Sequence, residues 1–153
     1  MEISYEMVQK KAAAYCSHQE VCPADMLKKM ENWGVDMQLA AKAVSYLINE
    51  KYIDNERYCR SFVNDKFRFN KWGKVKIAQA LRAKQIPDDV AERVLSEMDV
   101  SLYEEMLAGL LQKKAREVKA SNDYERKGKL LNFALQRGFE YPVADRLIKT
   151  LKL

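Results

Sequence analysis

The sequence is poor in the residues that interrupt helices. Only five glycines and three prolines occur among its 153 residues, and they fall between segments in which apolar residues recur with a helical period. Because glycine and proline mark the ends of secondary-structure elements, this shortage favours an all-α fold.

Long apolar runs are also absent. No run approaches the roughly 18 residues needed to cross a bilayer, and the segment Met1–Glu6 is acidic and lacks the apolar core of a signal peptide. We therefore expect a cytoplasmic protein that does not contact a membrane.

Residues typical of catalytic and metal sites are scarce. The three cysteines, Cys16, Cys22 and Cys59, are an odd number without metal-ligand spacing, so they indicate reduced, mostly buried thiols. The single histidine, His18, lies among polar residues, as an ordinary surface histidine does. Since no glycine-rich phosphate loop and no nucleophile motif accompany them, we predict no catalytic residue, no cofactor, no metal and no enzyme activity.

A pattern that occurs three times is the main feature present. It covers residues near 30–47, 81–98 and 134–151, and the central positions Gly34, Gln85 and Gly138 are 51 and then 53 residues apart. The apolar residue that follows each centre is itself followed by apolar residues at offsets of 4, 8, 9 and 12, which lie on one face of a helix. A period of about 50 residues suits a three-helix unit, and a tandem array of such units favours binding over catalysis.

We therefore predict three tandem three-helix units that form one continuous body, an elongated, curved, right-to-left array. The units are expected at residues 1–53, 54–99 and 100–153. The helices are expected near residues 4–17, 23–33, 36–50, 55–70, 73–84, 87–98, 101–119, 122–137 and 141–152.

Residues at the expected helix ends support these limits. Pro23, Pro87 and Pro142 suit the first turn of a helix, and Gly34 suits a left-handed helix end. The remaining signals are N-caps at Asp54 and Asn55, and capping boxes at Ser101–Glu104 and Asn122–Glu125.

Positive charge is concentrated in two segments. Residues 66–84 contain seven basic residues and no acidic one, and residues 112–129 contain seven basic and three acidic residues. The whole chain has a net charge of +5, so the remainder is acidic. Each segment alone could be a solvated helix face, but two in adjacent repeats favour a surface that binds a polyanion. Phe67 shares a helical face with Val63 and is expected in the core, whereas Trp72 could be exposed for stacking or docking, or buried.

The stretch from Leu47 to Ile86 resembles the RecX family, the bacterial regulators of the RecA recombinase. The resemblance rests on a leucine-containing helix end with the turn Tyr52-Ile53-Asp54, the pair Tyr58-Cys59, the segment Lys71-Trp72-Gly73-Lys74-Val75-Lys76-Ile77 and the segment Leu81-Arg82-Ala83-Lys84-Gln85-Ile86. It implies three tandem three-helix units and a non-enzymatic protein that binds the RecA–single-stranded-DNA filament. Such a protein inhibits filament extension, ATP hydrolysis and strand exchange in recombination, DNA repair and the SOS response.

The resemblance also implies a binding surface and partners. We expect the RecA filament as the partner, with single- or double-stranded DNA as a second ligand of the basic surface, and a monomeric protein. A stand-alone DNA-binding protein with helix-turn-helix-like units is the alternative. The matched motif supplies Lys71, Trp72, Lys74, Lys76, Arg82 and Lys84, and charge alone adds Arg126, Lys127 and Lys129.

One position departs from the family pattern. Gln85 stands where the family usually has glycine. This turn is therefore expected either to hold a left-handed glutamine, at a cost of about 1–2 kcal/mol, or to adopt another geometry.

Overall fold

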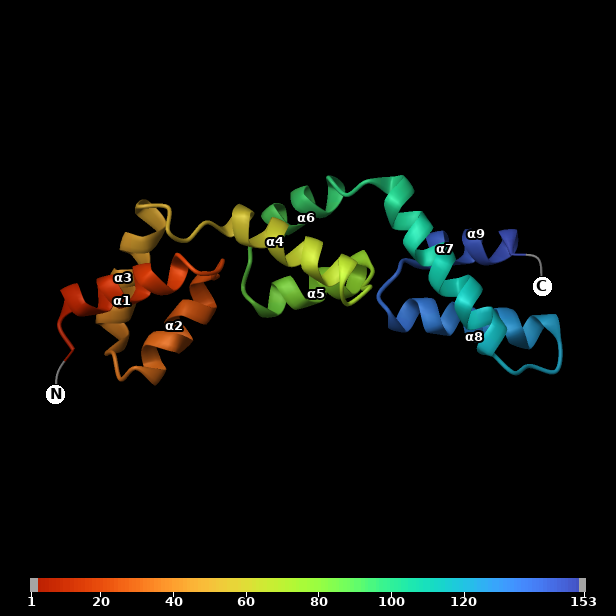
Figure 1. Ribbon diagram of the computed structural model, residues 1–153, viewed down its shortest axis with the longest axis horizontal. Helices are drawn as coiled ribbons and strands as arrows, with labels where there is room; N and C mark the ends of the chain where they lie inside the picture. Colours follow the sequence, from red (N-terminus) through yellow and green to blue (C-terminus); the bar gives the residue numbers. More distant parts are fainter. Residues whose placement is uncertain (1–2, 152–153) are drawn as a thin grey trace. The chain divides into compact units, whose positions relative to one another are not determined.

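The computed structural model describes residues 3–151, which form nine α-helices and no strand (Figure 1). The prediction of an all-α fold is confirmed, and the predicted helix ends within residues 3–151 lie within two residues of the observed ones. The predicted end of the last helix, residue 152, lies outside the described residues. The helices are α1 (Tyr5–Cys16), α2 (Pro23–Asn32), α3 (Met37–Asn49), α4 (Asn55–Arg68), α5 (Lys74–Ala83), α6 (Asp88–Ser96), α7 (Val100–Glu117), α8 (Asp123–Gln136) and α9 (Tyr141–Thr150).

The chain divides into two compact units. Unit 1 contains the described residues up to Phe62 together with Leu81–Ala91, and unit 2 contains Val63–Ala80 together with the described residues from Glu92 onward. The division runs through α4, α5 and α6, so each unit combines one outer repeat with part of the middle one. The three repeat boundaries predicted from the sequence stay a prediction.

Unit 1 has its core among α1, α2 and α3. Met26, Met30 and Leu47 are fully buried there, because each helix turns its apolar face inward. Cys22 and Cys59 are buried and Cys16 is half-buried, and none of the three forms a disulfide. His18 is exposed, as its polar surroundings indicate.

Unit 2 has its core among α7, α8 and α9. Leu107, Leu111 and Leu130 are fully buried. Tyr103 joins this core to the middle repeat, since its ring lies 5.7 Å from that of Phe67 and 5.3 Å from that of Phe139. The expected core position of Phe67 is thus confirmed, although its side chain is only half-buried.

The three repeat centres have the same backbone geometry. Gly34, Gln85 and Gly138 have φ angles of 82°, 63° and 91°, so all three are left-handed. The N–H of the residue after each centre donates to a carbonyl five residues earlier, and the N–H of the centre itself donates to a carbonyl three residues earlier. This is the Schellman arrangement for ending a helix. Of the two geometries left open for Gln85, the structure shows the left-handed one.

Most predicted caps are observed, with two corrections. Asp54 caps α4 by accepting from the Arg57 N–H at 2.9 Å, and Asn122 caps α8 by accepting from the Glu125 N–H at 2.8 Å. The capping box at Ser101 is wrong, because α7 begins one residue earlier and Asp99 caps it, accepting from the Leu102 N–H at 3.1 Å. Pro87 lies just before α6 rather than in its first turn, and its carbonyl accepts the first helical hydrogen bonds.

Candidate functional site

The basic segment at the α4–α5 connection lies mainly in unit 2. Arg68, Phe69, Asn70 and Lys71 form its tip and are all exposed. The backbone turns at Lys71, which has a left-handed φ of 58°. The tip therefore exposes an aromatic residue, Phe69, with one cationic residue before it and one after it in the sequence.

Trp72 is half-buried behind this tip. The Lys66 ammonium lies 4.9 Å from the centre of its ring, and the Lys76 ammonium lies 4.7 Å from it. These are cation–π distances, so the indole already contacts two charges of this protein. The sequence left open whether Trp72 is exposed or buried, and its side chain is intermediate between the two.

The basic segment is fixed to the third repeat by backbone hydrogen bonds within unit 2. The N–H groups of Gly73 and Val75 donate to the carbonyls of Arg137 and Gly138 at 2.8 and 2.9 Å. Between them, the Lys74 N–H donates to the Tyr103 hydroxyl at 2.9 Å. The first N–H groups of a helix have no partner within the helix, and here the neighbouring repeat supplies partners in place of a side-chain cap.

Glycine is required at this contact by space. A Cβ on Gly73 would lie 2.5 Å from backbone atoms of Gly138 and Phe139. A Cβ on Gly138 would overlap Lys76, and its φ of 91° also favours glycine. The direct contact between the two backbones thus explains the glycine of the Lys71-Trp72-Gly73 segment.

A buried hydroxyl supports the same contact. The Tyr103 hydroxyl donates to the Glu140 carboxylate while it accepts from Lys74. Burial of the phenol, and then its hydrogen bond to Glu140, raise the pKa of Tyr103 well above its ordinary value. The Tyr103 phenol is therefore uncharged, and its hydroxyl joins Lys74 to Glu140 through hydrogen bonds.

Arg82 and Lys84 belong to unit 1 and have partners in it. Arg82 forms an exposed ion pair with Asp88 at 3.1 Å. The Lys84 ammonium contacts both carboxylate oxygens of Asp25, at 2.9 and 3.1 Å, and so links the middle repeat to α2. Lys84 has a structural role that the sequence motif does not reveal.

The basic residues of the third repeat form a separate group. Arg126 donates to the Ala115 carbonyl at 3.0 Å, and Lys129 donates to the Lys119 carbonyl at 2.6 Å, so both hold the α7–α8 connection in place. Lys127 is exposed. These residues lie in the first half of α8, whereas Arg137, which contacts the α4–α5 tip, follows its end; eleven residues, about 17 Å of helix, separate Arg126 from Arg137. The structure does not bring the two basic groups together.

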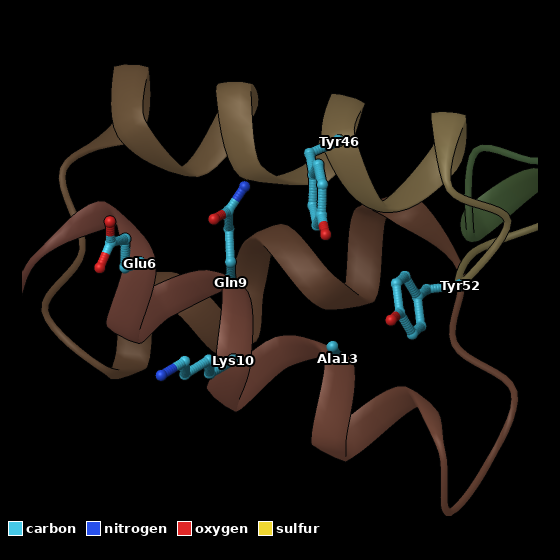
Figure 2. A pocket seen from close by; sticks show the side chains of 6 residues that line it. All are labelled: Glu6, Gln9, Lys10, Ala13, Tyr46 and Tyr52. Carbon is cyan, nitrogen blue, oxygen red and sulfur yellow. The ribbon is translucent and has the colours of Figure 1, made fainter.

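The first repeat carries a shallow polar hollow, shown in Figure 2. Its volume is about 390 Å³, and the rings of Tyr46 and Tyr52 on its wall lie 6.5 Å apart. Glu6, Gln9, Lys10 and Ala13 of α1 complete the wall. None of the nine predicted site residues lines this hollow. No group of histidine, cysteine and acidic side chains within residues 3–151 could hold a metal ion, and no helix there is long and apolar enough to span a membrane.

Two residues at the α4–α5 tip and its contact with the third repeat, Phe69 and Arg137, were not predicted as site residues from the sequence. Phe69 is exposed, a result that helical spacing from the buried Val63 and the half-buried Phe67 could have indicated. Arg137 donates from its side chain to the Asn70 carbonyl at 3.3 Å and offers its own carbonyl to Gly73. No local pattern marks Arg137, because its partners lie more than sixty residues earlier.

Comparison with known proteins places this arrangement in one family. Residues 54–95 match the family model for the second three-helix domain of RecX, and residues 103–148 match that for the third; together they cover more than half of the chain. "Regulatory protein RecX" of Chlorobium limicola is 29% identical over 83% of this chain and 78% of its own length. The protein of the same name from Clostridium botulinum strain Eklund 17B is 30% identical, over 79% of this chain and 57% of its own length.

Solved structures agree on the fold. The crystal structure of RecX from Lactobacillus salivarius superposes with a TM-score of 0.85 at 22% identity, covering 95% of this chain and 94% of that one. A second crystal structure, of a regulatory protein RecX, gives a TM-score of 0.82 at 20% identity over 97% of this chain and 79% of that one. The resemblance first indicated by residues 47–86 is thus confirmed, and the chain belongs to the RecX family of regulatory proteins.

Proposed function

We propose that this protein is a non-enzymatic regulator that binds the RecA–single-stranded-DNA filament and inhibits its ATP hydrolysis, extension and strand exchange. The observation that carries the proposal is the acid-free basic segment of the middle repeat, within the family match, which places exposed cations at the α4–α5 tip. A nucleoprotein filament is a polyanion whose phosphates attract such a surface.

Inhibition by this route needs no chemistry on the protein. Several weak contacts along one chain act together through their effective concentration, so the protein can bind several filament subunits without one strong site. Bridging adjacent subunits opposes the movements that each subunit makes during ATP hydrolysis. The partial separation of basic residues between the middle and third repeats suits contacts at more than one place.

The direct test is RecA ATP hydrolysis on poly(dT) with increasing amounts of this protein. We expect inhibition well below one protein per RecA subunit, because one bound regulator affects the growth or cycling of many subunits. Unchanged hydrolysis at a 1:1 ratio would contradict the proposal.

Charge-reversed variants test the surface itself. Lys71→Glu, Lys74→Glu and Lys76→Glu together should abolish inhibition while the helical circular dichroism is retained. Lys84 is left unchanged because its pairing with Asp25 stabilises unit 1. The matched control carries the same charge change at Lys10, Lys28 and Lys42 of the first repeat and should inhibit normally. Full inhibition by the first variant would remove the middle repeat from the binding surface.

The alternative, a stand-alone DNA-binding protein, differs in its response to salt. If about seven phosphate contacts supplied the affinity for duplex DNA, the slope of log K against log salt would be near −6, and affinity would fall by ~10³–10⁴ between 50 and 200 mM salt. A filament-binding protein should keep much of its affinity for RecA-coated DNA at a salt concentration that removes it from bare DNA. Equal losses on the two substrates would favour the alternative.

A further inference from the structure

Phe69 is an exposed aromatic side chain at the tip of the basic segment. It is 76% exposed, whereas the other four phenylalanines are buried or half-buried. Burying a phenylalanine stabilises a fold by about 1.5–3 kcal/mol, and Phe69 contributes almost none of this to the free protein. Its ring is therefore available to a ligand.

The backbone that carries Phe69 is held on both sides. The Phe69 N–H donates to the Asp65 carbonyl at 2.9 Å, and the Trp72 N–H donates to the Lys66 carbonyl at 3.1 Å. The Arg137 side chain donates to the carbonyl of Asn70, the next residue along the tip. A tip fixed in this way loses little conformational entropy when a ligand binds to it.

The charges around the ring indicate the chemistry of that ligand. Arg68 directly precedes Phe69, Lys71 follows two residues later, and both are exposed. No acidic residue occurs between Asp65 and Asp88, so none of the sixteen residues that follow Lys71 carries a negative charge. An exposed aromatic residue with a cationic residue before and after it in the sequence suits a single strand, because every base has a face that can stack and the strand's phosphates attract the cations.

We propose that Phe69 stacks on an unpaired base of single-stranded DNA, with Arg68 and Lys71 contacting the phosphates on either side. The proposal rests on the proposed function, because it assigns a ligand to the same basic segment. A single strand is favoured over a duplex since bases within a duplex already stack on both faces. Trp72 does not serve this purpose, because it is half-buried and contacts the ammonium groups of Lys66 and Lys76.

The test measures binding of fluorescent oligo(dT) to the full chain at 50 mM salt, without a recombinase. Stacking on one base contributes about 1–3 kcal/mol, so Phe69→Ala should weaken binding by about tenfold or more. Phe69→Trp should retain the affinity, and Phe69→Leu should lose it, because leucine keeps apolar surface but has no ring. Tyr141→Ala, which removes another exposed ring of unit 2, should have no effect.

An oligonucleotide of the same length with abasic sites separates stacking from charge. Phe69→Ala should not change binding to that strand, since it keeps the phosphates and lacks the bases. Replacing Arg68 and Lys71 together with glutamine should instead reduce the magnitude of the salt slope on oligo(dT) by about 1.4, at roughly 0.7 for each phosphate contact on a single strand.

Three results would overturn the stacking assignment. They are no binding of oligo(dT) by the unmodified protein, unchanged affinity in Phe69→Ala, and full affinity in Phe69→Leu. If Phe69→Ala binds oligo(dT) normally but no longer inhibits RecA, the ring contacts a protein pocket; stacking is then wrong while the regulatory function stands. If stacking is observed but the unmodified protein leaves RecA activity unchanged, the regulatory function alone is wrong.

Discussion

Gln85 occupies a backbone conformation that favours glycine. Its φ of 63° is left-handed, like the angles of 82° at Gly34 and 91° at Gly138 in the corresponding turns, and the same Schellman hydrogen bonds surround it. A non-glycine residue in this region costs roughly 1–2 kcal/mol. The middle repeat therefore has backbone strain at a turn where the other two repeats have glycine.

Replacing this residue should release the strain. We expect Gln85→Gly to raise the free energy of unfolding by about 1 kcal/mol, since greater freedom of glycine in the unfolded chain offsets part of the gain. Urea unfolding followed by circular dichroism measures the change. Gly34→Ala is the matched control: no atom lies within 4 Å of its new Cβ, and the left-handed φ alone should destabilise the protein by a similar amount. A less stable Gln85→Gly variant would contradict this account.

The Glu125 carboxylate at the start of α8 should make the stability of the protein sensitive to acid. Hydrogen bonds from the Ser121 side chain and N–H, and then the neighbouring Lys129, lower the pKa of Glu125 from 4.5 to about 2. A lowered pKa in the folded state stabilises the protein above the ordinary value, and this stabilisation is lost as the pH falls from about 4.5 to 2. Over that interval the unmodified protein should lose more stability than Glu125→Gln, as measured by urea unfolding at several pH values. Glu105→Gln on α7 should follow the unmodified protein, and parallel curves for all three would contradict the prediction.

For individual residues, the sequence predicted backbone geometry better than it predicted side-chain partners. The left-handed turn at Gly34 followed from glycine chemistry and the repeat pattern. The pairing of Lys84 with Asp25 did not, because the two residues are 59 positions apart and neither has an unusual local pattern. From the sequence alone, a lysine that binds a ligand cannot be told from one that forms an ion pair within the fold, because the partner is known only from the structure.

Among the elements, α7 is capped by a different residue from the one predicted. Both Asp99 and Ser101 have side chains that can cap a helix, and the sequence offered Ser101 with Glu104 as a capping box. The structure uses Asp99, whose carboxylate accepts from the Leu102 N–H, and places Ser101 inside the first turn. Overlapping cap signals two residues apart are resolved by packing, here by the burial of Tyr103.

These two residues form a matched pair for mutation. Asp99→Ala removes the cap and should lower the free energy of unfolding by about 1 kcal/mol. Ser101→Ala should change it by less than about 0.5 kcal/mol, since alanine is a good residue for a helix interior. Equal losses in the two variants would show that Ser101 contributes to the cap after all.

Most of the element pattern was accessible from the sequence. Apolar spacing located all nine helices of residues 3–151, because each helix carries its buried apolar residues on one face. The partners that complete the start of α5 were not accessible, since Arg137, Gly138 and Tyr103 come from another repeat.

Over the whole molecule, replacing glycines with alanine tests where two backbone segments are in direct contact. Gly73 and Gly138 meet within unit 2, where a Cβ has no room, whereas Gly109 in α7 and Gly128 in α8 have no atom within 4 Å of an added Cβ. We expect Gly73→Ala and Gly138→Ala each to destabilise the protein by about 2 kcal/mol or more. Gly109→Ala and Gly128→Ala should stabilise it by about 0.5–1 kcal/mol, because alanine favours a helix interior.

Thermal unfolding of the four variants, followed by circular dichroism, compares these effects directly. The first two should melt at lower temperature than the unmodified protein and the last two at the same or a higher temperature. If Gly73→Ala melted like Gly109→Ala, the backbone contact between the middle and third repeats would not be a required feature of unit 2. The repeats themselves were predictable from the sequence, but this contact depends on the fold of the whole unit.

The hydrogen bonds from residues 73–75 to the third repeat also have a consequence for the order of events on the ribosome. Their acceptors at Arg137 and Gly138 are synthesised more than sixty residues later, which corresponds to roughly 3–13 s at typical translation rates. Until then, the N–H groups of Gly73 and Val75 lack the carbonyl partners that they have in the folded protein. The repeat that carries the basic segment therefore reaches its final form only when the nascent chain has delivered the third repeat.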